Sequence, residues 1–170
     1  MHLLSDRLIG LVEDHTGDIV KRWLAILRND PTMAALSPRH MEHLQGKAWD
    51  ILKHLSQWVG YDTSKEEIER RYEAEGQDFY DMGIPLWEGI RTMYTLRRAL
   101  WLFVGSESQF DSAFQLSQLL ELSDRVILFF DRAEFYMARG YLDRMRGRAQ
   151  EVGKLDAVAI ERIFLAKPER

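Results

Sequence analysis

The chain has 170 residues, of which 46% are hydrophobic and 29% are charged, as in one ordinary globular domain. It contains no cysteine, which excludes disulfide scaffolds, thiolate metal sites and thiol catalysis and fits a reducing compartment. Its formal net charge of −4 is the wrong sign for a general nucleic-acid binder. No apolar run approaches the ~20 residues that span a bilayer. We therefore expect a cytoplasmic protein with neither nucleic acid nor membrane as partner.

Apolar residues recur at helical spacing through the first third of the chain. Leu4, Leu8 and Leu11 share one face, and the pattern resumes over 19–27 after a short His-Thr-Gly-Asp interruption. A second helix is predicted from Ser37, a good N-cap residue followed by proline, to the glycine at position 60.

The middle of the chain predicts a charged helix followed by a corner. Ser64 and Glu67 have the spacing of a capping box, and the acidic and basic residues of 65–75 indicate a salt-bridged solvent face. Gly83 is expected at the end of this helix with a positive φ, and Pro85 at the start of the next one.

A long pattern begins near Asp111 and extends for about thirty-five residues, which predicts either one overhanging helix or a break near Ser123. Four arginines within 139–148 are interpreted as a solvated helix end, with an anionic partner surface as the alternative. No strand pattern is present. The fold class is therefore predicted as all-α, a single-domain bundle of five or six helices with a long C-terminal helix.

The sequence offers little support for an enzyme. It has no Gly-rich phosphate loop, no Gly-x-Ser-x-Gly motif and no acids paired in a predicted cleft, so we expect no catalytic residues. His40 and His43 lie one helical turn apart with Glu42 between them, but catalytic zinc requires three protein ligands. His54 could serve as a haem ligand in an all-α chain of this length, although a satisfied core or boundary histidine is the preferred interpretation. We expect no metal and no cofactor.

Large aromatic rings are concentrated in the first four predicted helices, where they serve either as core filler or as the wall of a ligand pocket. Arg97 shares a helix face with Tyr94 and Trp101, so its charge should have a ligand or a buried partner such as Glu75 or Asp81. A small apolar or anionic ligand is the functional alternative to plain packing. The candidate pocket residues are Trp23, Trp49, Tyr80, Trp87, Tyr94, Arg97 and Trp101.

The long helix carries apolar residues on more than one side, which is typical of a helix that is central or shared with a second chain. Because most soluble oligomers are symmetric dimers, a homodimer seam is expected here. The candidate seam residues are Val126, Ile127, Phe130, Met137 and Tyr141.

The order of these features resembles the N-terminal sensor domain (RsbRD) of RsbR-type RsbT co-antagonists. The resemblance is carried by "DIVKRWLAILRNDP", by "LSPRHMEHLQGKAWDILKHL" and by "GIPLWEGIRTMYTLRRALW", and it extends from about residue 6 to 145. It implies a non-haem, globin-like helical fold that dimerises through its later helices and receives signals in stressosomes. On this basis residues 1–150 are assigned to the sensor domain and 151–170 to a short amphipathic tail.

The resulting expectation is a non-enzymatic regulatory sensor of the stress response, homodimeric and able to contact a protein partner in a signalling complex. Family members usually continue into an output domain, commonly a phosphorylatable STAS domain, so a free-standing sensor and a piece of a longer chain are both left open. The alternative function is a globin-like ligand- or haem-binding sensor that uses His54 or His43.

Overall fold

The computed structural model describes residues 4–33, 36–60, 63–109, 112–153, 156 and 158–160. These residues form helices and no strand. In chain order the elements are α1 (Leu4–Asp14), α2 (Thr16–Arg28), the 3₁₀ turn η1 (Pro31–Met33), α3 (Pro38–Lys53), α4 (Leu55–Trp58), α5 (Lys65–Asp81), α6 (Leu86–Glu107) and α7 (Ala113–Gly153).

The prediction of one all-α domain with a long C-terminal helix is confirmed. The helices over the described ranges outnumber the five or six expected, partly because the chain turns at His54 and separates a short α4 from α3. The long pattern forms one helix of 41 residues, unbroken at Ser123. The tail predicted for 151–170 lies largely outside the described residues, as does Asp111. Within the part of the chain that is described, no helix combines the length and the apolar character of a membrane span.

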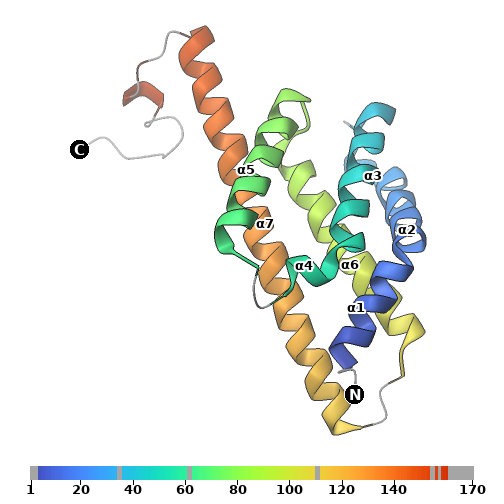
Figure 1. Ribbon diagram of the computed structural model, residues 1–170. Helices are drawn as coiled ribbons and strands as arrows, with labels where there is room; N and C mark the ends of the chain where they lie inside the picture. Colours follow the sequence, from blue (N-terminus) through green and yellow to red (C-terminus); the bar gives the residue numbers. More distant parts are fainter. Residues whose placement is uncertain are drawn as a thin grey trace.

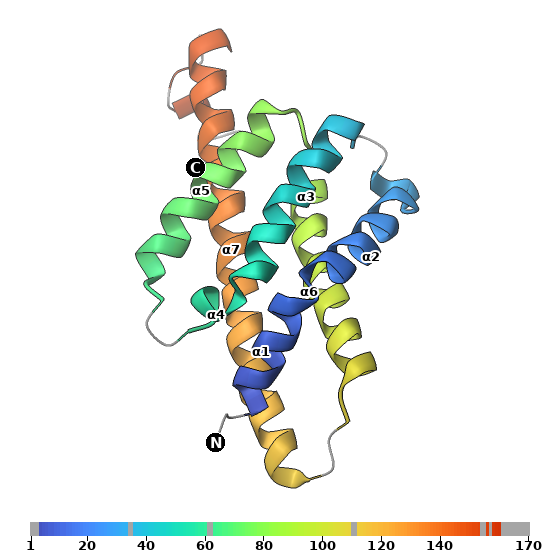
Figure 2. The ribbon, with the colours of Figure 1, turned by 45° about the vertical axis from the view of Figure 1, so that its right-hand side comes forward.

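The helices pack in two groups around α6. Figure 1 shows α5 and α7 side by side on one side of the bundle and α1, α2 and α3 on the other, and α6 packs against both α7 and α2. Figure 2 shows the same arrangement after a turn of 45°. In both views the end of α7 rises beyond the other helices.

Local sequence signals start two of the helices. The Ser37 hydroxyl accepts the backbone N–H of His40 at 3.3 Å, and Nδ1 of His40 accepts the backbone N–H of Ser37 at 3.1 Å. This is a capping box in which histidine replaces the usual glutamate. Ser64 caps α5 by accepting the Glu67 N–H at 3.0 Å. Both predicted N-caps are confirmed.

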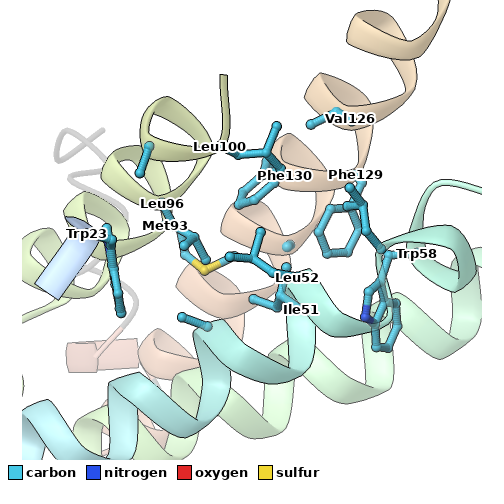
Figure 3. Packing of buried hydrophobic residues seen from close by; sticks show 14 of the residues in the cluster. Trp23, Ile51, Leu52, Trp58, Met93, Leu96, Leu100, Val126, Phe129 and Phe130 are labelled. Carbon is cyan, nitrogen blue, oxygen red and sulfur yellow. The ribbon is translucent and has the colours of Figure 1, made fainter. Parts of the chain in front are cut away.

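The hydrophobic core is continuous through all the long helices, and Figure 3 shows its centre. Trp23 of α2 packs there with side chains from α3 and α6, while Phe129 and Phe130 enter from α7. Trp58 of α4 stacks on Phe129 with ring centroids 5.7 Å apart, which fastens the short helix to the long one. Full burial of a phenylalanine side chain such as that of Phe129 contributes roughly 1.5–3 kcal/mol to the free energy of unfolding.

The helices α5 and α7 cross in direct backbone contact. A Cβ built on Gly76 would lie 1.9 Å from the carbonyl oxygen of Met137, and one built on Gly140 would lie 2.1 Å from that of Glu73. Beside this crossing the guanidinium of Arg139 pairs with the carboxylates of Glu69 and Glu73. The helix expected to form a plain solvent face is therefore half of the tightest helix pair in the described chain.

The corner between α5 and α6 has the predicted form. Gly83 has φ +73°, and its N–H donates to the Tyr80 carbonyl at 3.0 Å, while the Ile84 N–H donates to the Phe79 carbonyl at 2.9 Å. These two bonds form a Schellman motif, which requires a left-handed residue at the position of Gly83. Pro85 is the N-cap of α6 and precedes its first helical residue.

Candidate functional site

The seven residues predicted to line a ligand pocket lie in different environments. Trp23 is buried, and its Nε1–H donates to the Thr95 hydroxyl at 2.9 Å and to the Thr92 carbonyl at 3.2 Å. Tyr80 and Trp101 are half-buried. The three most exposed rings of the set are Trp49, Trp87 and Tyr94. Trp23 is the member of the set that lines a small, largely apolar cavity between the helices.

Arg97 has a partner other than those expected. Its Nη1 lies 2.7 Å from Oδ1 of Asp131, which joins α6 to α7 across the molecular surface. Glu75 and Asp81 are engaged elsewhere, Glu75 with Lys47 and Asp81 with an arginine of α7. The expectation that Arg97 has a partner is confirmed, and the proposed identities of that partner were wrong.

The Arg97–Asp131 ion pair lies in a surface that combines candidates from both predicted sets. Tyr94 and Trp101 are one helical turn to either side of Arg97, and Ile127 is one turn before Asp131. Leu120 lies two turns before Ile127 on the same side of α7. We call this surface the α6–α7 face and define it by Tyr94, Arg97, Trp101, Leu120, Ile127 and Asp131.

Of the five residues predicted for a dimer seam, three are buried in the core, one is half-buried and one is exposed. Val126, Phe130 and Met137 have 0% exposure because α7 turns them into the core of its own chain, so they cannot form a seam. Tyr141 is half-buried, with its ring edge against Tyr80. Ile127 is the exposed member, at 40%.

Glu134 lies one turn after Asp131 and carries an unusual carboxylate. Its Oε1 is buried and has no hydrogen-bond partner in the structure. Burial raises the pKa of this carboxyl above its usual value; Arg97 opposes the rise and Asp131 adds to it. The edge of the α6–α7 face thus contains a carboxylate that is poorly solvated when ionised.

A second buried carboxylate lies inside the helix bundle. Glu75 is 6% exposed, and its two oxygens contact Lys47 Nζ and, at 3.3 Å, His43 Nε2. Burial alone would raise the pKa of Glu75, but the hydrogen bonds from His43 and Lys47 outweigh burial and hold the pKa below its ordinary value. Glu75 is therefore ionised near neutral pH.

Glu75 was assigned to a solvent face with the other acids of its segment, and this assignment was wrong; it was also named as a possible buried partner of Arg97, and it is buried but pairs with Lys47. The sequence does contain a sign that Glu75 is buried. Glu75 lies three residues after Tyr72 and four before Phe79, so it shares a helix face with two apolar anchors of the same helix. The face that buries those rings also buries the carboxylate.

A cavity of about 20 Å³ adjoins Glu75 where α2, α3, α5 and α6 meet. It has room for about one water molecule. Its walls include Trp23, Phe79 and Met93. The buried hydroxyl of Tyr72 belongs to the lining and makes no hydrogen bond of good geometry, although Arg71 lies near enough to lower the pKa of the phenol against the dominant effect of burial, which raises it.

His40 and His54 each contact a backbone carbonyl. Nε2 of His40 lies 3.0 Å from the Met82 carbonyl, which ties the start of α3 to the end of α5. His54 is exposed and contacts the Asp50 carbonyl at 3.1 Å, so its expected place in the core or at its boundary was wrong. Over the described ranges, no three His, Asp or Glu side chains are grouped so that they could hold a metal ion.

Comparisons with protein-family models, with curated proteins and with solved structures found no match. The geometry offers two features with functional character, the α6–α7 face and the cavity beside Glu75.

Proposed function

We propose that this chain is a non-enzymatic regulatory domain of the RsbR N-terminal type, which signals by self-association and by contact with a protein partner. The observation that carries the proposal is the apolar outer side of α7. Leu120 and Ile127 are 58% and 40% exposed there, and Leu128 and Phe135 extend the apolar surface around the helix. Several exposed apolar side chains gathered along one helix indicate an interaction site, whereas single exposed apolar residues are ordinary.

A second copy of the chain is the occupant that fits this surface best. The α6–α7 face contains the cation of Arg97 and the anion of Asp131 among apolar side chains. A two-fold axis brings the same patch of both copies together, so a patch that holds both signs of charge can be complementary to itself. The exposed ring of Tyr94 and the half-buried ring of Trp101 supply side chains that are enriched in interfaces.

The long helix also supports a role in transmission. Figures 1 and 2 show its C-terminal end beyond the bundle, where a downstream protein could contact it without disturbing the core. A signal acts on such a system by its differential affinity for two packings of the helix. Cytoplasmic location and participation in a stressosome-like complex belong to this proposal.

Light scattering coupled to size exclusion tests the self-association. The wild-type chain is expected to be a dimer at tens of micromolar, and Ile127→Asp is expected to be monomeric, because a charge would be buried without a partner. Ile26→Asp is the matched control, since Ile26 is 38% exposed on α2, a helix that contributes no residue to the α6–α7 face. A monomeric wild type refutes the proposal, and a dimer that survives Ile127→Asp places the seam elsewhere.

A further inference from the structure

Two long cationic side chains that are partly exposed to solvent line the cavity beside Glu75. Lys47 is 37% exposed and reaches inward from α3 to Glu75, and Arg71 is 35% exposed and pairs with Asp50. Both are flexible side chains on fixed helices, so they can move aside without a change in the backbone. Access to the cavity from solvent therefore depends on the rotamers of Lys47 and Arg71.

The charged side chains around the cavity favour a cationic ligand over an anionic one. Glu75 places a negative charge at the cavity, where His43 and Lys47 contact its two oxygens, whereas the cation of Arg71 is paired with Asp50. An anion would have to share the cavity with the Glu75 carboxylate, which repels it. A cation would gain the carboxylate and also the faces of aromatic side chains such as Trp23 and Phe79.

The Tyr72 hydroxyl supplies the second contact that an occupant would use. Tyr72 is 2% exposed and lines the cavity one helical turn before Glu75, and its hydroxyl makes no hydrogen bond of good geometry, although Arg71 lies nearby. Lys47 satisfies Glu75 but makes no hydrogen bond to this hydroxyl. An ammonium group placed slightly deeper has three N–H donors and can serve both oxygen atoms at once.

The size of the occupant follows from the space that Lys47 would vacate. The cavity alone holds about one water molecule, but withdrawal of the lysine ammonium and its last methylene groups adds room for a few more heavy atoms. From this geometry we infer that the cavity is a binding site for a short alkylammonium ion, a small protonated primary amine that replaces the Lys47 ammonium at Glu75 and donates to the Tyr72 hydroxyl.

Ethylammonium chloride is the probe for an NMR titration of the full chain, followed through backbone amide shifts. Saturable shifts are expected at residues that line the cavity. Sodium chloride at equal ionic strength controls for salt, and ethanol, with the same number of heavy atoms, controls for apolar binding. Neither control should give saturable shifts. This measurement does not depend on self-association, so its failure leaves the proposed function standing.

Three variants separate the roles of the side chains. Lys47→Met removes the internal competitor and should tighten binding about tenfold, because the receptive state no longer has to be reached by expelling the lysine. Lys65→Met, at the exposed start of α5, is the matched control and should leave the affinity unchanged. Tyr72→Phe should weaken binding about fivefold through the loss of one hydrogen bond.

Glu75→Gln keeps the shape of the side chain and should abolish saturable binding. Three outcomes would overturn the inference. These are equal saturation by ethanol, undiminished binding by the Glu75→Gln variant, or no saturable shift in both the wild type and the Lys47→Met variant.

Discussion

Replacement of Gly76 by alanine tests the crossing of α5 and α7. The new Cβ would lie 1.9 Å from the Met137 carbonyl oxygen and 2.8 Å from the Tyr141 nitrogen, whereas ordinary contact begins at 3.4 Å. All of the atoms it meets belong to the backbone of α7, so no side chain can rotate away. Relief requires the two helices to separate by roughly 1.5 Å at the crossing, which forfeits much of the dispersion energy between them.

The expected loss is about 4 kcal/mol in the free energy of unfolding, above the ordinary cost of overpacking. For a chain of this size the loss corresponds to a fall in Tm of roughly 8–16 °C. Thermal unfolding followed by far-UV circular dichroism measures it. Gly140→Ala should act in the same direction, because its Cβ would lie 2.1 Å from the Glu73 carbonyl oxygen.

Gly46→Ala is the matched control for this prediction. Gly46 lies on an exposed side of α3, and a Cβ there would meet nothing within 4 Å. Alanine should raise stability at this position by about 0.5–1 kcal/mol, since glycine is unfavourable inside a helix. A Gly76→Ala variant as stable as the wild type would refute the close crossing.

Three further predictions concern single residues and are measured by thermal unfolding. Gly83→Ala should cost about 1 kcal/mol, because φ is +73° there; an unchanged Tm would contradict the Schellman corner. Ser64→Ala should cost about 1 kcal/mol through loss of the cap on α5, and Ser64→Asp should restore the stability. Because the folded-state pKa of Glu134 is raised, its contribution to stability is fully present below the usual value of 4.5 and is lost as pH rises through the raised pKa. Glu134→Gln should therefore raise Tm at neutral pH, with the gain vanishing in acid, and a gain that is independent of pH would count against the buried carboxylate.

Features that depend on a few neighbouring residues could be predicted from the sequence. Ser37, Ser64 and Gly83 act through hydrogen bonds that span three to five residues, so their residue types define the helix ends. The all-α class follows in the same way from the helical spacing of apolar residues.

Features that depend on distant parts of the chain could not be predicted. The partner of Arg97 lies 34 residues away, and nothing in the local pattern distinguishes Asp131 from other acids. Val126 and Ile127 are adjacent residues about 100° apart around α7, and only the packed bundle shows which of them the core covers. The spacing of apolar residues along α7 indicated that the helix has more than one apolar side, but it did not show which side faces the core and which faces solvent.

The glycine crossing has a mechanical consequence. Glu75 directly precedes Gly76, whose backbone touches that of Met137, so a displacement of the α5 backbone at this point passes to the main chain of α7 with no deformable side chain between them. The crossing acts as a pivot, and α7 continues about 24 Å beyond it to Gly153. A tilt of about 5° at the pivot moves the far end of the helix by about 2 Å, so small motions inside the bundle are magnified at its tip.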